Sequence, residues 1–133
     1  MSDTEIPTGL VIVDHGSRLD AANAIVETFC VVVWSLSGGR FVAIQPAHME
    51  LATPSLDDAV AACVERGAER VVVAQFFLVP GRHSSVDIPK LATDAAATHN
   101  VEVLVTEHLE ADDRLAEILL DRVDALIPPN LFP

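Results

Sequence analysis

Short apolar runs and amphipathic segments alternate along the chain. An unbroken apolar run bounded by turn residues indicates a strand buried on both faces, whereas apolar positions three and four apart indicate a helix packed by one face. Read in this way, the chain has four strands and four helices in strict alternation. The strands are predicted over 9–13, 41–45, 70–77 and 101–106, and the helices over 20–36, 54–66, 87–98 and 111–126.

Two signals compete for the start of the second helix. Thr53 and Pro54 fit an N-cap followed by proline at the first helical position, whereas Ser55 and Asp58 fit a capping box slightly further along. The first helix contains a run, 30–34, that would indicate a strand on its own. We interpret it as helix, since a strand there would leave a long unstructured segment before it. This run is expected to lie mainly in the core, with its surplus apolar surface forming part of a subunit contact.

Strict alternation of strand and helix is typical of an α/β fold. It predicts a flavodoxin-like, four-stranded parallel sheet with right-handed crossovers and helices on both faces. A chain of 133 residues allows a single domain, 1–133, with a core over about 9–126. The tail 127–133 contains three prolines and is not expected to continue the last helix.

Composition narrows the functional class. Half of the residues are apolar and 21% are charged, which excludes a disordered chain. No apolar run approaches the ~20 residues of a membrane span, and the acidic first residues resemble neither a signal nor a transit peptide. The net charge of −12 argues against nucleic acid and anionic membranes as partners. A small anionic ligand stays possible, because local arginines or helix N-termini can bind one.

The two cysteines, Cys30 and Cys63, both fall on predicted helices and form no CxxC pair. We expect reduced, buried thiols in a cytoplasmic, reducing compartment, with no disulfide and no iron–sulfur cluster.

Candidate functional residues gather where the predicted strands end. In open α/β sheets, ligands bind beyond the carboxyl ends of the strands. Of the five histidines, only His99 falls on the opposite edge. The side chains that follow the four strands in turn are His15, then His48 with Glu50, then His83, and then His108.

A histidine cluster with a carboxylate suits two kinds of chemistry. Neutral imidazole binds Fe, Co, Ni and Zn, and it is the usual general base near neutral pH. Ser17 and Ser55 lack the context of a nucleophile elbow, and the chain has no phosphate-binding loop. These observations favour metal handling over acyl transfer or nucleotide binding. A lone histidine is more often a surface or hydrogen-bonded residue, which suits His48 and His108 better than His15 and His83, because the latter two lie in glycine-marked turns.

Three sequence blocks resemble a known family. They are Asp14-His15-Gly16-Ser17-Arg18, the segment 47–55 (AHMELATPS), and the segment 76–83 (FFLVPGRH) with 87–89 (DIP). In this order and spacing they are similar to the class II chelatases of the small sirohydrochlorin cobaltochelatase and ferrochelatase family, with the sirohaem-pathway ferrochelatases most alike. The resemblance extends from about Leu10 to Leu126. One departure is Gln75, where many relatives have proline.

The resemblance implies a fold, a reaction and a set of site residues. The chain would be a chelatase half-domain that pairs as a homodimer and inserts Fe²⁺ or Co²⁺ into sirohydrochlorin without ATP, in sirohaem or cobalamin biosynthesis. His15 and His83 would bind the metal, which is itself a substrate, and one of His15, His83 and Glu50 would accept the pyrrole protons. The residues expected to bind the tetrapyrrole are Ser17, Arg18, His48 and Arg82.

Three alternatives stay open at this point. The first is a non-catalytic module that carries a metal or a tetrapyrrole on the same fold. The second is a histidine-phosphatase-like enzyme, which would need an arginine where Asp14 stands. The third is an interaction domain in which the histidines are incidental. The sequence also leaves open whether iron, cobalt or nickel is the physiological metal.

Overall fold

The computed structural model describes residues 6–78, 81 and 83–132, without the side chains of residues 83 and 84. Strands and helices alternate in the predicted order. The strands are β1 (Thr8–Asp14), β2 (Ala43–His48), β3 (Arg70–Gln75) and β4 (Glu102–Val105). The helices are α1 (Asp20–Leu36), α2 (Leu56–Glu65), α3 (Ile88–His99) and α4 (Asp113–Asp124), with a π-helical turn η2 (His83–Asp87) before α3 and a 3-10 turn η3 (Pro129–Leu131) after α4.

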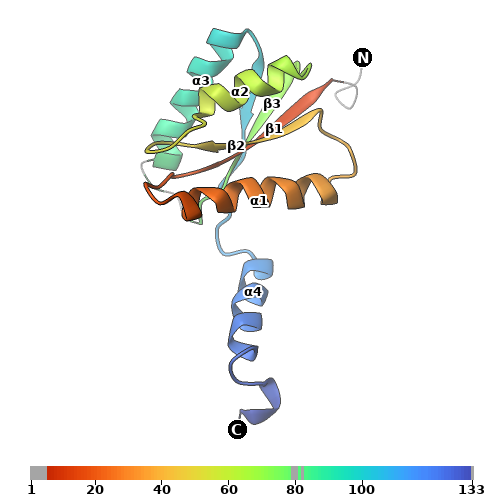
Figure 1. The fold of residues 1–133 in the computed structure, drawn as a ribbon, viewed down its shortest axis with the longest axis vertical. Helices are drawn as coiled ribbons and strands as arrows, with labels where there is room; N and C mark the ends of the chain where they lie inside the picture. Colours follow the sequence, from red (N-terminus) through yellow and green to blue (C-terminus); the bar gives the residue numbers. More distant parts are fainter. Residues whose placement is uncertain (1–5, 79–80, 82, 133) are drawn as a thin grey trace.

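The four strands form one parallel sheet in the order β2-β1-β3-β4. Helices α2 and α3 cover one face of this sheet and α1 lies along the other (Figure 1). The prediction of a single α/β domain with helices on both faces is therefore confirmed. Because β1 lies in the middle, its side chains are buried on both faces, as its unbroken apolar run predicted.

The two faces of the sheet are covered unequally. The larger core cluster lies under α2 and α3, where Val11, Val60 and Ile88 are completely buried. Gly9 allows α2 to approach β1 closely, since a Cβ at this position would lie 2.7 Å from the Cβ of Cys63. The smaller cluster, under α1, holds four buried residues among those that the structure describes: Leu10, Ile12, Val26 and Cys30. One face of the sheet is thus well sealed and the other is only partly covered.

The start of α2 settles the choice between the two capping signals. The Asp58 backbone N–H donates to Ser55 Oγ at 3.1 Å, and the Ser55 backbone N–H donates to Asp58 Oδ2 at 3.0 Å. Ser55 is therefore the N-cap of a reciprocal capping box. These hydrogen bonds stabilise the carboxylate and lower the pKa of Asp58. The second strand also differs from its prediction, because it begins at Ala43 and continues to His48.

Two further expectations need correction. Val31, Val32 and Trp34 are exposed, so the run 30–34 contributes only Cys30, and in part Val33, to the core. The reason is that α1 contacts the sheet through a narrow row of side chains, of which Val26 and Cys30 are buried. The amphipathic α4 forms as predicted, but none of its residues is buried, and it projects away from the sheet (Figure 1). Within the described residues, no helix is both long and apolar enough to cross a membrane.

Cys30 and Cys63 are free, buried thiols, as the sequence predicted. Burial raises the pKa of each to about 11. We expect neither thiol to react rapidly with a disulfide reagent such as DTNB at pH 8 in the folded protein, since the thiolate is the reactive form. Both should react after unfolding in guanidinium chloride. Rapid reaction of the folded protein would contradict the buried placement of these side chains.

Candidate functional site

The carboxyl ends of β1 and β2 bring two of the predicted residues together. Asp14 and His48 are opposite each other in the parallel register, so the segments that follow them start at the same edge. Their backbones stay paired beyond the strands: the Met49 N–H donates to Asp14 O at 2.9 Å, and the Glu50 N–H donates to His15 O at 3.1 Å. As a result, His15 Nε2 lies 3.4 Å from Glu50 Oε1.

Gly16 makes this close pairing possible. Its φ of +93° lies in the region that residues with a side chain rarely adopt. A Cβ at this position would also lie only 1.8 Å from the Glu50 carbonyl oxygen. The glycine of the first block thus lets one backbone pass directly against the other, and this contact sets the separation of His15 and Glu50.

The His15–Glu50 pair is accessible and chemically versatile. The two side chains are 46% and 47% exposed, so a ligand can reach both. An imidazole nitrogen and a carboxylate oxygen can bind a borderline divalent metal together, and either can accept a proton. The described residues hold no group of three or more metal-ligand side chains. His83, the second predicted ligand, begins η2, but its side chain is outside the described residues, as is Arg82 altogether.

Behind this accessible pair lies a second pair, in which His48 is buried and Asp14 is partly buried. His48 Nδ1 is 2.7 Å from Asp14 Oδ1, and the His48 side chain is only 1% exposed. The His48 backbone N–H donates to Pro54 O at 2.9 Å, which ties the start of the loop that carries Glu50 to its end. His48, predicted to bind substrate, therefore lies in the interior beneath the edge. Its position favours an indirect role.

Ser17 and Arg18 border a polar hollow beside the accessible pair. The hollow has a volume of about 480 Å³, and its walls are the start of α1 and the segment 51–53. Ser17 Oγ accepts a hydrogen bond from the Leu19 N–H, and Asn23 bonds to the Ser17 backbone through both its side-chain oxygen and its side-chain nitrogen. Sequence reasoning missed Asn23. Its signal is an asparagine in the first turn of α1, directly after Asp14–Arg18, where its side chain can hydrogen-bond to the backbone of that turn.

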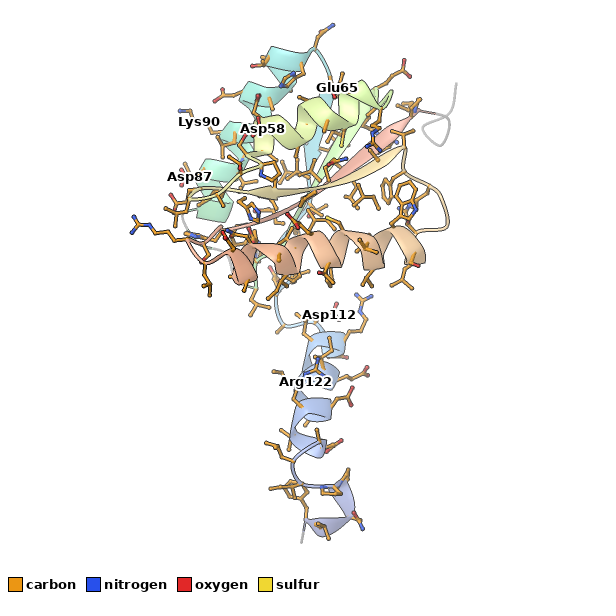
Figure 2. All side chains as sticks on the ribbon, in the orientation of Figure 1. Asp58, Glu65, Asp87, Lys90, Asp112 and Arg122 are labelled. Atoms are coloured by element: carbon orange, nitrogen blue, oxygen red, sulfur yellow. The ribbon has the colours of Figure 1, made fainter. Side chains whose placement is uncertain are left out.

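A cation that sequence reasoning also missed lies on the other side of Glu50. Glu50, Asp87 and Lys90 line a hollow of about 250 Å³ together with Met49 and Leu91. Figure 2 shows Asp87 and Lys90 at the same end of α3. Lys90 does not follow a strand directly, so a search of strand ends passes over it. The position of Lys90 in the first turn of α3, a helix that begins near the carboxyl edge of the sheet, is the signal that could have identified it.

The remaining histidines have local partners. His108 Nε2 lies 3.0 Å from Glu110 Oε1, and it follows β4, which β3 separates from β1. His99 Nε2 lies 2.9 Å from Asp57 Oδ1 of α2, at the end of α3 away from the site. Gln75 is buried and its Nε2 donates to Thr106 O at 2.7 Å, which links β3 to the segment after β4.

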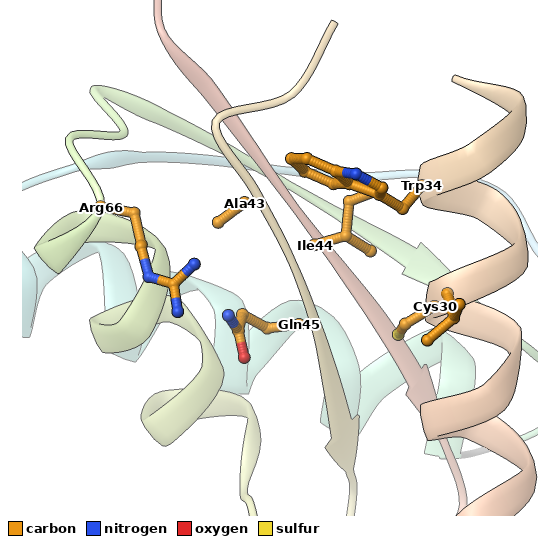
Figure 3. A pocket seen from close by; sticks show the side chains of 7 residues that line it. Cys30, Trp34, Ala43, Ile44, Gln45 and Arg66 are labelled. Carbon is orange, nitrogen blue, oxygen red and sulfur yellow. The ribbon is translucent and has the colours of Figure 1, made fainter. Parts of the chain in front are cut away.

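A different hollow, of about 340 Å³, lies at the edge strand β2 (Figure 3). It is bordered by the amino-terminal half of that strand, away from the carboxyl edge. Its lining holds neither an imidazole nor a carboxylate. The lining residues are Cys30, Val31, Trp34, Ala43, Ile44, Gln45 and Arg66. Its metal-ligating side chain is Cys30, and burial raises the pKa of this thiol to about 11, which disfavours the thiolate that binds metals. The carboxyl edge is therefore the better candidate site.

Comparison with known proteins places the chain in a family context. The CbiX family model matches residues 9–126. The chloroplastic sirohydrochlorin ferrochelatase of Arabidopsis thaliana is 44% identical over 116 residues, which is 86% of this chain and 51% of the relative. The sirohydrochlorin cobaltochelatase of Methanopyrus kandleri is 32% identical over 135 residues, covering 86% of this chain and 93% of the relative.

Solved structures agree with this picture. The CbiX protein from Marinobacter aquaeolei is 30% identical, with a TM-score of 0.71 over 91% of this chain and 98% of that one. SirB from Bacillus subtilis, solved with Fe³⁺, is 21% identical and has a TM-score of 0.83 over 93% of this chain and 49% of that one, which shows a shared fold. The chain thus spans about half the length of SirB and of the Arabidopsis thaliana relative. It spans nearly the whole length of the Marinobacter aquaeolei CbiX protein and of the Methanopyrus kandleri cobaltochelatase.

Proposed function

Because the chain belongs to the CbiX family, we propose that it is a sirohydrochlorin chelatase, a lyase that inserts Fe²⁺ or Co²⁺ into this tetrapyrrole. The observation that carries the proposal is the His15–Glu50 pair, which combines an imidazole and a carboxylate on an open edge. The metal is a substrate that must be bound and then released, so a site with few protein ligands suits the reaction better than a closed one.

Each member of the site has a role in this proposal. His15 and His83 hold the incoming divalent metal with coordination positions left open. Glu50, within 3.4 Å of His15, accepts the pyrrole protons that the metal displaces. His15 and His83 are the other candidates for that proton transfer. The reaction exchanges two pyrrole protons for one divalent ion, so it is balanced without a redox partner or a nucleotide.

The tetrapyrrole is a polyacid, whereas the protein carries a net charge of −12. Binding therefore needs positive charge concentrated at the site. Arg18 and Lys90 supply it from the two hollows beside the accessible pair, and we assign them, with Ser17 and Arg82, to the peripheral carboxylates. Binding energy from the periphery would bend the ring and expose its pyrrole nitrogens to the metal.

His48 acts through Asp14 as a positioning residue in this proposal. Replacing His48 by alanine should remove the 2.7 Å hydrogen bond and loosen the two segments that carry His15 and Glu50. We expect Co²⁺ affinity to fall about 10-fold, the lower end of the cost of losing a residue bonded directly to a metal ligand, because His48 acts on His15 and Glu50 only through the backbone. Co²⁺ titration by visible absorbance measures this. His48→Asn, which keeps a side-chain N–H near Nδ1, should restore most of the affinity. Equal weakening in both variants would contradict the positioning role.

The wider biochemical setting forms part of the proposal. The enzyme acts without ATP and without an iron–sulfur cluster, in the cytoplasm, on the sirohaem or the cobalamin branch of tetrapyrrole (porphyrin) biosynthesis. It works as a homodimer, in which a second copy provides the other wall around the macrocycle. The SirB chain of Bacillus subtilis supports this view, since this chain covers about half of it and one such chain is nearly as long as two copies of this one.

The test is anaerobic metal insertion. Purified protein is mixed with sirohydrochlorin and either Fe²⁺ or Co²⁺, and the absorbance change on insertion is followed with and without ATP. We expect insertion well above the protein-free rate and independent of ATP, and the ratio of the two metals indicates the pathway. A folded protein that accelerates neither metal would overturn the proposal.

The main alternative is a non-catalytic carrier of metal or tetrapyrrole, which would use the same exposed pair. A histidine phosphatase is less compatible with the site, because the Asp14 carboxylate occupies the place of the required arginine and is bonded to His48. If the protein were an interaction domain in which the histidines are incidental, replacing His15 would leave its function unchanged.

A further inference from the structure

The start of α1 is held differently from the starts of two other helices. Its N-cap residue is Leu19, which makes no side-chain hydrogen bond to the first turn. By contrast, Ser55 caps α2 and Asp112 caps α4 through a side-chain oxygen, the usual arrangement. Helix α1 also leaves the sheet at its carboxyl edge, beside the candidate site (Figure 1). The turn before α1 therefore depends on other contacts to keep its shape.

Asn23, in the first turn of α1, makes two of these contacts. Its Oδ1 accepts a hydrogen bond from the Ser17 N–H at 2.9 Å, and its Nδ2 donates one to the Ser17 carbonyl oxygen at 2.8 Å. Both distances are those of good hydrogen bonds. A side-chain amide carries an acceptor and a donor side by side, so it can bond to both polar backbone groups of one residue. A carboxylate or a hydroxyl of similar size could not replace it fully, because a carboxylate has no donor and a hydroxyl has only one oxygen.

The contacts around Ser17 fix both peptide units that flank the Cα of Arg18. The peptide between Ser17 and Arg18 is held at its oxygen by Asn23 Nδ2. The following peptide is held at its nitrogen, since the Leu19 N–H donates to Ser17 Oγ at 3.0 Å. The backbone has only two soft dihedral angles per residue. Fixing the peptide planes on both sides therefore defines the direction in which the Arg18 side chain leaves the backbone.

The direction of Arg18 matters because of the charges around it. Arg18 borders the polar hollow of about 480 Å³ beside the accessible pair, and Asp20 and Glu27 of α1 line the same hollow. Asn23 lies on this side of α1 as well, three residues after Asp20 and four before Glu27. A carboxylate of the tetrapyrrole is repelled by the two acidic side chains, so it needs the Arg18 guanidinium in place to bind there. A neutral amide at position 23 also avoids a third negative charge.

We propose that Asn23 is a positioning residue that orients Arg18 toward the peripheral carboxylates of the tetrapyrrole. The inference rests on the proposed function and adds to it a residue that acts on substrate binding. Order that is present before binding lowers the entropy that binding must cost. His15 is held by a separate contact, because the Glu50 N–H donates to its carbonyl oxygen. Loss of Asn23 should therefore weaken binding of the tetrapyrrole much more than binding of the metal.

The first experiment measures the two affinities separately, in the full chain and without oxygen. Metal-free sirohydrochlorin and Co²⁺ are each titrated alone and followed by absorbance. We expect Asn23→Ala to weaken sirohydrochlorin binding about tenfold, the scale of one hydrogen bond to a charged group, and to leave Co²⁺ binding unchanged. Alanine favours helix more than asparagine does, so α1 should still form, which far-ultraviolet circular dichroism checks. Equal loss of both affinities, or loss of neither, would overturn the proposal.

A second variant and a matched control separate the hydrogen bonds of Asn23 from its place in the hollow. Asn23→Asp keeps the acceptor for the Ser17 N–H but loses the donor to the Ser17 carbonyl oxygen, and should bind sirohydrochlorin at least as weakly as Asn23→Ala. Glu27→Ala shortens another α1 side chain that lines the hollow. It removes a negative charge and should bind sirohydrochlorin at least as tightly as the wild type. Weakening equal to that of Asn23→Ala would overturn the proposal.

A double-mutant cycle tests whether Asn23 acts through Arg18. Arg18→Ala should itself weaken sirohydrochlorin binding. Once the guanidinium is absent, its orientation has no effect, so the variant with both Arg18→Ala and Asn23→Ala should bind no more weakly than Arg18→Ala alone. A merely structural role of Asn23 would make the two losses add. Additive losses would therefore overturn the proposal.

Amide hydrogen exchange tests the brace without any substrate. The Ser17 N–H should exchange about tenfold faster or more in Asn23→Ala, whereas the Ala59 N–H, which donates to Ser55 O in α2, should keep its rate. An unchanged rate at Ser17 would overturn the proposal. This measurement also keeps the two possible failures apart. A wild type with a protected Ser17 amide that binds no sirohydrochlorin would overturn the proposed function and this inference with it. Equal sirohydrochlorin binding by the wild type and Asn23→Ala would overturn this inference alone.

Discussion

Replacing His15 by alanine is expected to lower the rate of metal insertion about 100-fold or more. The imidazole is half exposed, and its Nε2 lies 3.4 Å from Glu50 Oε1, so it is placed to bind the metal and to share the proton transfer with the carboxylate. Loss of one positioned acid–base group alone typically costs about 10²–10⁴-fold. Rates are measured by absorbance under anaerobic conditions at several Co²⁺ concentrations.

The matched control for this variant is His99→Ala. His99 is also a histidine with a carboxylate neighbour, Asp57 at 2.9 Å, but it lies at the far end of α3. We expect its rate to equal that of the wild type. If His15→Ala retained full activity while folding normally, the carboxyl edge would not be the site of insertion.

Replacing Gly16 by alanine should damage both the site and the fold. A Cβ at this position would meet the Glu50 carbonyl oxygen at 1.8 Å, so one of the two segments must move. Such overpacking typically costs about 1–3 kcal/mol of unfolding free energy. The left-handed backbone adds about 1–2 kcal/mol for a residue with a side chain. We expect a lower urea midpoint together with strongly reduced insertion, because the displaced segment carries Glu50.

Gly38 offers a control that separates the cost of the steric contact from the cost of the left-handed backbone. It also has a left-handed backbone, with φ of +66°, but a Cβ there would have no atom within 4 Å. Gly38→Ala should therefore show only the backbone cost and keep its activity. Equal destabilisation in the two variants would mean that the contact of Gly16 with Glu50 does not constrain the site.

The sequence predicted the sheet and the placement of His15 and Glu50 at one edge of it, for identifiable physical reasons. The apolar run at β1 is buried on both faces, so its pattern carries no competing signal. Ser55 and Asp58 form the capping box that their spacing indicates. Because parallel strands end at a common edge, the rule that places sites there also predicted that His15 and Glu50 would meet.

Other features depend on contacts that a linear pattern does not contain. The apolar stripe of α4 predicts a helix packed by one face, whereas none of the residues of this helix is buried in the structure. The predicted strand 41–45 places His48 beyond its end, like His15, but β2 continues to His48 and pairs it with Asp14, which turns its side chain inward. Lys90 reaches the site from the side of α3, so only the packed structure brings it beside Glu50.

The most direct test of the central claim is the number of turnovers per chain. Sirohydrochlorin and Co²⁺ are supplied in large excess over the protein, and the metallated product is counted from its absorbance after subtracting the protein-free reaction. A chelatase forms many product molecules per protomer, and we expect this result, with the yield lost in His15→Ala. Formation of no more than one product per protomer would contradict catalysis and identify the protein as a carrier of metal or tetrapyrrole.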